Sequence, residues 1–229
     1  MSATAARGSA GRALPRGPHR LPRDAVLSSQ RGRLLDAMAD VVSAKGYTAV
    51  TVGDVVGRAR VSRKTFYEHF DGREDCFLAA YDAGVDLLVT RIEEAEARER
   101  SFADRVRAGA RAYLETLSAE PAFARTFLLE ITAAGPRALD RRARVHHLFR
   151  ARVAALHEDF GVQVAAGWED AGPPPAESLR AALVGGTDEL VSDWVRAGRI
   201  AELPKLEATL VHLHLSLFAD PGREGERAA

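Results

Sequence analysis

Three side chains that can contact nucleic-acid bases stand together after Ser62: Arg63, Lys64 and Thr65. Serine is a preferred residue at the N-cap of a helix, and aromatic residues follow at helical spacing. Arginine and lysine can donate to guanine O6 and N7, while the methyl group of threonine can contact thymine. The pattern predicts the first turn of a short helix that reads bases in a major groove. The alternative is that these are ordinary solvated residues of a helix surface.

No pattern typical of an enzyme or a metal site competes with this prediction. The chain has no glycine-rich phosphate loop, no HExxH pair and no Gly-x-Ser-x-Gly. His146 and His147 are adjacent, so on a helix they point about 100° apart and cannot both face one metal ion. His212 and His214 have the same difficulty. Cys76 is the single cysteine, so an internal disulfide and a cysteine-rich zinc site are both excluded. We expect no enzyme activity, no metal and no cofactor.

The elements that must position Arg63 and Lys64 are three short helices. Apolar residues at helical spacing predict a helix from about residue 29 that stops at Gly46. Thr51 is then the expected N-cap of a second, two-turn helix, and Ser62 begins the third. Between the last two lies a tight turn at Arg60. The second helix is too short to stand alone, and we expect the three helices to form one compact unit within residues 29–75.

The rest of the chain predicts further helices and no strand alternation. Asp71 is expected to cap a long helix, and Pro121 and Pro136 stand where two more would begin. The predicted segments are 71–92, 102–117, 123–131, 139–160, 176–197 and 204–218. About nine helices result, which makes the fold class all-α. The organisation is a basic disordered tail (1–28), a helix-turn-helix domain (29–75), a larger helical domain (76–219) and a second disordered tail (220–229).

Composition and charge agree with a small domain beside a larger one. The chain has 229 residues, 46% of them hydrophobic, with a formal net charge of +0. Residues 1–73 hold 13 Lys/Arg against 6 Asp/Glu, and the remainder hold 19 against 26. A basic N-terminal section suits a polyanion, and nucleic acid is the leading candidate. No apolar run approaches the roughly 20 residues of a membrane-spanning helix, so we expect a cytoplasmic protein without a membrane partner.

Two stretches carry a resemblance to a known family: GYTAVTV at 46–52 and ARVSRKTFYEHF at 59–70. Over about residues 29–78 they resemble the DNA-binding domain of TetR-family transcriptional regulators. The resemblance implies nine helices, with the helix-turn-helix in the second and third. It also implies a homodimer formed by the last two helices (176–197 and 204–218), and a C-terminal domain that takes a small organic ligand. The partner would be double-stranded DNA.

The resemblance also assigns phosphate contacts to Thr51, Tyr67, His69 and Arg73, each of which can donate to a phosphate oxygen. Such contacts set the register on the duplex without reading its sequence. For Tyr67 the alternative is a core aromatic. For His69, the phosphate contact and the core position are about equally supported. The tail arginines Arg12, Arg16, Arg20 and Arg23 can follow the DNA backbone or enter a minor groove, or can simply be solvated.

Two positions depart from the family pattern. The family usually has glycine where this chain has Arg60, in a turn position expected to be left-handed, and a side chain there costs roughly 1 to 2 kcal/mol. A phosphate contact by Arg60 can offset that cost. The family also favours alanine at Val56, where the second helix lies close to the third, so the angle between them is expected to change slightly.

The middle helices are expected to enclose the ligand pocket. Candidate lining residues are Tyr81, Tyr113, Phe127, Glu130, Phe149 and Trp168, most of which we expect to belong to the core. Arginines around His146 and His147 suit an anionic ligand or form a solvated basic face. The leading interpretation is a repressor released from a palindromic operator by a ligand. The alternatives are an activator, a regulator without an effector, or a helical carrier or enzyme, which would have no use for the motif at 62–70.

Overall fold

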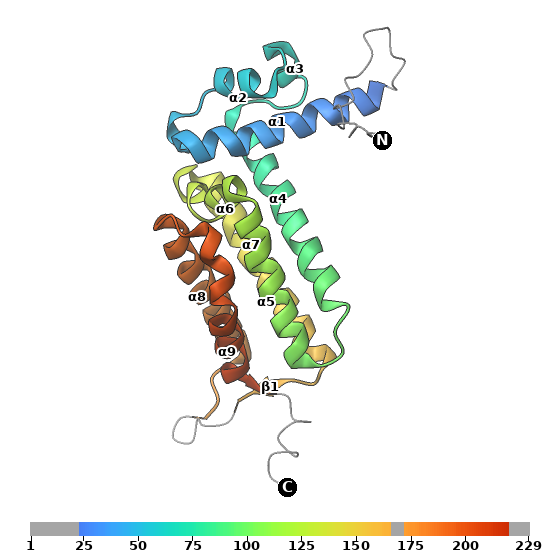
Figure 1. Cartoon of the computed structure of the whole chain (residues 1–229), viewed down its shortest axis with the longest axis vertical. Coiled ribbons are helices and arrows are strands. Elements are labelled where there is room, and N and C mark those ends of the chain that lie inside the picture. The colour runs from blue at the N-terminus through green and yellow to red at the C-terminus, as the bar shows by residue number, and fades with distance from the viewer. Residues whose placement is uncertain (1–22, 166–171, 220–229) are drawn as a thin grey trace, which may run out of the picture.

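The computed structural model describes residues 23–165 and 172–219 of the 229-residue chain. Within these residues there are nine α-helices, three short 3-10 helices and one pair of two-residue strands (Figure 1). A small unit of three helices lies at one end of the molecule, and a larger helical bundle forms the rest. The prediction of an all-α fold with about nine helices is therefore confirmed.

The small unit consists of α1 (Arg23–Lys45), the 3-10 helix η1 (Tyr47–Ala49), α2 (Val52–Ala59) and α3 (Arg63–Tyr67). α2 and α3 are too short to be stable in water alone, so their apolar side chains pack against α1 in a common core. Fully buried side chains from all three helices form this core: Leu34, Met38, Val55 and Phe66.

The first helix begins earlier than its sequence pattern predicted. α1 starts at Arg23, inside the segment expected to be a disordered tail, and not near residue 29. Once a helix has a stable nucleus, extending it by a few residues costs little, so a helix can continue past its last buried position. The expected tails at 1–22 and 220–229, with the tail arginines Arg12, Arg16 and Arg20, lie outside the described residues.

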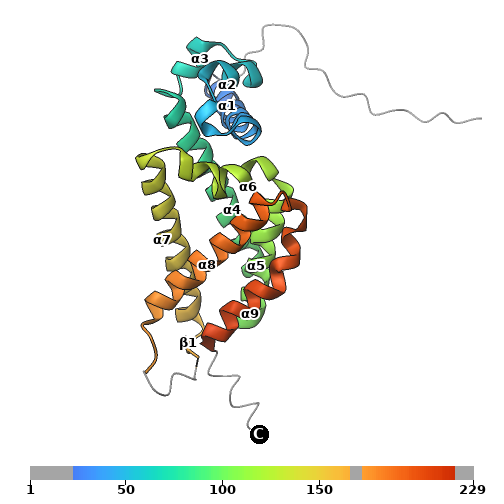
Figure 2. The same cartoon turned by 90° about the vertical axis from the view of Figure 1, so that its left-hand side faces the viewer.

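The helix α4 (Arg73–Glu96) leaves the small unit and runs down the bundle (Figure 1). The rest of the bundle is α5 (Phe102–Ala119), α6 (Pro121–Leu128), the 3-10 helix η2 (Glu130–Ala133), α7 (Pro136–Asp159), α8 (Ala176–Arg196), the 3-10 helix η3 (Ile200–Leu206) and α9 (Glu207–Leu217). The turned view places α8 between α7 and α9 (Figure 2). One hydrophobic cluster runs from α1 through α4 and α6 into α8, so the two units share a core.

Several element ends differ from the sequence-based expectations. Gly72, and not Asp71, is the N-cap of α4; the Asp71 N–H donates to the Asp75 carboxylate at 3.2 Å. The expected helix 123–131 divides at Leu129, where α6 passes into η2. Strands β1 (Gln163–Val164) and β2 (Phe218–Ala219) pair antiparallel, although no alternation predicted them. Pairs this short leave no periodic signal in a sequence.

Arg60 adopts the left-handed conformation that its turn position predicted, with φ 54 and ψ 49. Among the described residues it is the one non-glycine with positive φ. Its N–H donates to the carbonyl of Val56, and the N–H of Val61 donates to the same carbonyl at 3.1 Å. These bonds end α2 and turn the chain into α3 within three residues, so the angle between the two helices depends on a strained backbone position.

Arg60→Gly should therefore stabilise the fold by about 1 kcal/mol, because glycine reaches the left-handed region without a Cβ penalty. Denaturant unfolding of the two proteins measures the difference. Arg60→Ala is the matched control, since it removes the guanidinium but keeps the Cβ. If alanine stabilised the protein as much as glycine does, the gain would come from lost charge and not from relieved strain.

Candidate nucleic-acid interface

The first turn of α3 presents two cationic side chains to solvent. The Ser62 hydroxyl caps the helix by accepting from the Thr65 N–H at 3.0 Å, and it also lies 2.9 Å from the Thr65 hydroxyl. Arg63 and Lys64 follow the cap, and the Lys64 side chain is 87% exposed. On the opposite side of α3, Phe66 is fully buried. The helix is thus fixed to the core by one face and offers donors on the other.

Arg63 does not extend straight into solvent. Its guanidinium reaches back over the first turn of α2, where a Cβ built on Gly53 would lie 3.4 Å from Nη2. The N-termini of α2 and α3 therefore lie close together on one surface. Both carry N–H groups that no helix carbonyl satisfies, which suits a polyanion.

The predicted phosphate contacts near the end of α3 lie in different surroundings. Tyr67 is 57% exposed, with its ring edge-on to Phe66 at 5.4 Å. The Tyr67 hydroxyl has no hydrogen-bond partner among the described residues and can donate to a phosphate oxygen. His69 is partly buried, and its Nε2 is buried without a hydrogen-bond partner among the described residues. Only Nδ1 of His69 remains for a phosphate contact in this arrangement.

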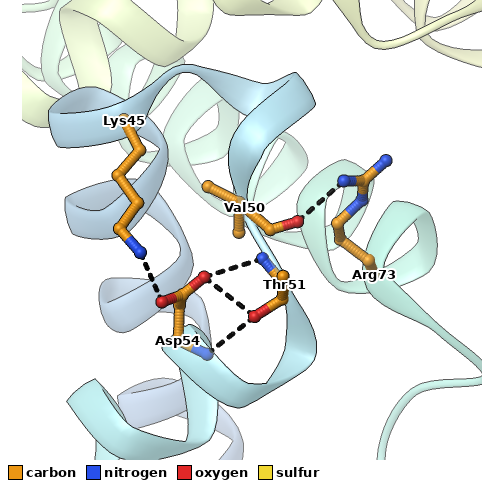
Figure 3. Close-up of polar contacts among 5 residues, drawn as sticks. All are labelled: Lys45, Val50, Thr51, Asp54 and Arg73. Carbon is orange, nitrogen blue, oxygen red and sulfur yellow. Dashed lines mark hydrogen bonds and ion pairs between the residues drawn. The ribbon is translucent and has the colours of Figure 1, made fainter.

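A capping box fixes the start of α2 (Figure 3). The Thr51 hydroxyl accepts from the Asp54 N–H at 3.2 Å, and the Asp54 carboxylate accepts from the Thr51 N–H at 2.9 Å and from its hydroxyl at 2.8 Å. Lys45 of α1 forms an ion pair with the same carboxylate. The hydrogen bond from Lys45 is the largest cause that lowers the pKa of Asp54 to about 2, followed by those from Thr51.

The Arg73 side chain bonds to backbone carbonyls of the small unit, although the resemblance assigned it a phosphate contact. Its Nη1 donates to the carbonyl of Val50 at 2.7 Å (Figure 3). The same Nη1 also donates to the carbonyls of Thr48 at 3.3 Å and Tyr47 at 3.4 Å. Its guanidinium also lies 4.5 Å from the centroid of the Tyr47 ring, a cation-π distance. The Tyr47 carbonyl also accepts from the Val50 N–H at 3.2 Å, and Nη1 of Arg73, at the start of α4, is the shared side-chain donor to the carbonyls of Thr48 and Val50.

Glu130 of the larger domain holds the same segment from the other side. Its carboxylate accepts from the Tyr47 N–H at 2.8 Å. Gly46 has φ +78, and a Cβ built there would lie 3.5 Å from the Glu130 carboxylate. The chain that leads from α1 into the cap of α2 is thus bonded to both α4 and η2. The sequence predicted that Glu130 lines a ligand pocket. In the structure Glu130 lies instead where the small unit contacts the larger bundle.

A cavity of about 160 Å³ lies among α4, α5, α6, α7, α8 and α9. Of the predicted pocket residues, Tyr113, Phe127 and Phe149 line it. Tyr81 is fully buried and stacks on Phe127 at 5.6 Å but does not line the cavity. Trp168 lies outside the described residues. The aromatic walls are complemented by aliphatic ones: Ile92, Val106, Val153, Leu156, Leu183 and Leu210.

The cavity also has polar residues that sequence reasoning missed. Glu96 accepts from Arg152 at 3.2 Å, and burial raises the pKa of this carboxyl despite the arginine. Gly109 allows the arrangement, because a Cβ there would lie 2.6 Å from the Glu96 carboxylate. At the other end, Asp188 forms an ion pair with Arg142. No spacing rule links residues on four separate helices, so these pairs leave no signal in the sequence.

His157 of α7 and His214 of α9 form a buried pair, with their Nε2 atoms 2.8 Å apart. Burial is the largest cause that lowers the pKa of His157 to about 4 and that of His214 to about 3. Both rings are therefore neutral at pH 7, and one Nε2 donates to the other. The rings of Phe102 and Phe218 lie against both histidines, and Phe160 packs on Phe102. The pair joins α7 to α9 at the wall of the cavity, which His214 lines.

Other kinds of site are not apparent in the part of the chain that the structure covers. Across 23–165 and 172–219, no group of three or more His, Cys, Asp or Glu side chains is placed to hold a metal ion. In the same ranges, no helix has the length and apolar character needed to cross a membrane. Cys76 is buried, and burial raises the pKa of its thiol to about 12, so it is not a reactive thiolate.

Comparison with known proteins identifies the small unit. Residues 34–80 match the family model of the bacterial regulatory proteins of the tetR family. The HTH-type transcriptional activator FasR of Mycolicibacterium smegmatis is 33% identical over 97 residues, which is 42% of this chain and 42% of that protein. The match thus spans about two fifths of that relative's length. The matched family consists of DNA-binding regulators and not of enzymes.

The whole fold is similar to solved regulators at low identity. The fatty acid degradation regulator FadR from Bacillus halodurans aligns with a TM-score of 0.69 and 18% identity, covering 88% of this chain and 97% of that one. FadR from Bacillus subtilis, solved in complex with stearoyl-CoA, aligns with a TM-score of 0.67 and 18% identity, over 81% of this chain and 97% of that one. These likenesses establish the fold of both domains.

The capping box should make the stability of the protein sensitive to acid. A lowered pKa in the folded state means that the Asp54 carboxylate stabilises the fold above its unfolded pKa near 4. This contribution is lost as the pH falls toward the folded value of about 2. Asp54→Asn should therefore lower the melting temperature at pH 7, and the deficit should shrink between pH 4 and pH 2.

Thermal unfolding followed by circular dichroism across this pH range measures the effect. Asp36→Asn is the control, because it removes an exposed α1 carboxylate that has no hydrogen bond or ion pair among the described residues. A deficit for Asp54→Asn that stayed constant down to pH 2 would show that the carboxylate charge does not stabilise the helix start.

Proposed function

We propose that this chain, a transcriptional regulator of the TetR family, binds a roughly palindromic site on double-stranded DNA as a homodimer and is released by a small organic ligand. The observation that carries the proposal is the first turn of α3, where Arg63 and the 87% exposed Lys64 stand on a helix fixed by buried Phe66. The second helix of a helix-turn-helix places its N-terminal residues against base edges in the major groove. The site of action would be the chromosome, in the cytoplasm.

A second copy of the chain is expected against α8 and α9. Exposed positions on these helices carry short or polar side chains: Ala182 and Gly186 on α8, Thr209 and His212 on α9. Gly186 has open space around its Cα, so a helix from a second copy can approach closely. A two-fold dimer presents two equivalent recognition helices, which is the reason to expect a palindromic operator.

Ligand control would pass through two connections between the cavity and the small unit. α4 begins beside the helix-turn-helix and carries Ile92 and Glu96 into the cavity wall. α6 carries Phe127, which lines the cavity, three residues before the Glu130 that bonds Tyr47. A ligand that lowers DNA affinity about 100-fold must prefer the DNA-incompetent arrangement by roughly 2.8 kcal/mol. The stearoyl-CoA complex of the Bacillus subtilis regulator supports the proposal that a protein with this fold binds a ligand.

A second candidate is transcriptional activation, because the relative from Mycolicibacterium smegmatis is named as an activator. The two functions share every contact with DNA and differ in the effect on the promoter. A reporter fused to the promoter beside the gene separates them. Deletion of the gene raises the reporter signal if the protein represses and lowers it if the protein activates.

Substitutions in α3 should separate base reading from phosphate contact. Arg63→Ala or Lys64→Ala should cost about 1 to 3 kcal/mol and relax the preference at particular bases. Tyr67→Phe should weaken binding to all sites about equally, because a phosphate contact carries no sequence information. Fluorescence anisotropy on the DNA that flanks the gene, and on single-base variants of it, measures both effects.

Arg91→Ala is the matched control for these substitutions, since it removes an exposed arginine of α4 outside the small unit. Binding of the unchanged protein should also weaken steeply with salt. If both Arg63→Ala and Lys64→Ala left the base preference intact, the assignment of these two residues to base reading would be wrong.

A further inference from the structure

A surface groove meets the cavity between α7 and α8. His146 and Val184 line both, so the cavity and the groove are neighbours on the two sides of those side chains. The groove itself also contains Arg142, His147 and Arg150. The apolar walls of the cavity and the cationic side chains of the groove are therefore separated only by His146 and Val184.

The charge of Arg150 is poorly compensated. Its Nη1 lies 3.6 Å from the Glu177 carboxylate, beyond hydrogen-bond range, and that glutamate is 63% exposed and shared with Arg180 at 3.8 Å. Its Nε is buried without a hydrogen-bond partner among the described residues. The Nε of Arg142 is likewise buried without a partner among the described residues, but Nη2 of Arg142 forms a close ion pair with Asp188. Arg150 is therefore the guanidinium in the groove that has no close carboxylate partner.

His147 adds a donor to the same place. Arg150 Nη2 lies 2.6 Å from His147 Nδ1, and because a guanidinium has no acceptor, Nδ1 accepts this bond. In the neutral imidazole the proton then sits on Nε2, which becomes a donor. An anion in the groove would receive bonds from both side chains.

The size of the cavity limits the apolar part of a ligand. An apolar cavity of about 150 Å³ holds a benzene molecule, so the 160 Å³ here suits an aromatic ring or a chain of similar size. Phe127, Phe149 and Leu183 are among the walls that such a group would contact. Burial of that group would supply affinity, and the groove would fix its orientation.

We propose that the ligand is an amphipathic anion, with its apolar part in the cavity and its carboxylate or phosphate group on Arg150 and His147. The inference rests on the proposed ligand control of DNA binding and adds the chemical class of the ligand. A charged hydrogen bond that is retained in the complex gives an anion about tenfold higher affinity than a neutral molecule of the same chain length.

Calorimetric titration of the full chain with four compounds of equal chain length tests the proposal: hexanoate, hexyl phosphate, 1-hexanol and hexylammonium. The expected order places at least one anion about tenfold above 1-hexanol, with hexylammonium weakest. Which anion binds more tightly distinguishes a carboxylate ligand from a phosphate ligand. Equal affinities for the anions and the alcohol would overturn the proposal.

Three variants locate the anion. Arg150→Gln should remove the preference for the anion and leave the affinity for 1-hexanol unchanged, whereas Arg150→Lys should keep part of the preference. Arg144→Gln is the matched control, because it removes an exposed arginine of α7 that does not line the groove. A preference for the anion that survived in Arg150→Gln would overturn the assignment of the site.

DNA binding by each unliganded variant, measured by anisotropy, is the separate readout of the proposed function. All three variants should bind DNA as the unchanged protein does, which also verifies that they fold. If the unchanged protein bound no DNA yet preferred the anion through Arg150, the regulatory function would be refuted and the ligand class retained. If it bound DNA and showed no preference, only the ligand class would fail.

Discussion

Two side chains from distant elements hold the backbone between α1 and α2 by bonding to its polar groups. Arg73 donates to the carbonyls of Tyr47, Thr48 and Val50, and Glu130 accepts from the Tyr47 N–H. Unpaired backbone groups in a partly buried segment are costly, so this segment is held where these two side chains place it. Because it leads directly into the cap of α2, the position of the helix-turn-helix depends on the same bonds.

This arrangement explains how one segment connects both domains. Arg73 is the first residue of α4, which runs along the cavity, and Glu130 begins η2, which follows the α6 helix that carries Phe127. A movement of either helix changes the position of the bonds at Tyr47. In the proposed ligand control, these bonds form a short physical connection between the cavity and the helix-turn-helix.

The helices and their order could be predicted from sequence, because helical spacing and caps are local. Thr51 and Ser62 cap α2 and α3 as predicted, and Arg60 is left-handed as the turn required. Contacts across the fold could not be predicted. Glu130 and Tyr47 are separated by 83 positions, and nothing near either residue indicates the other. The same holds for Arg73, whose residue type suits a phosphate as well as three carbonyls.

The central claim is that the bond between Glu130 and Tyr47 positions the DNA-binding unit. Hydrogen exchange of the Tyr47 amide and the α2 amides tests it most directly, in Glu130→Ala and in Glu130→Gln, which keeps an acceptor. We predict that exchange in the alanine variant is roughly fivefold to tenfold faster at Tyr47 and faster along α2, with weaker DNA binding, while the glutamine variant stays near the unchanged protein. Unchanged exchange and unchanged DNA affinity in Glu130→Ala would contradict the account.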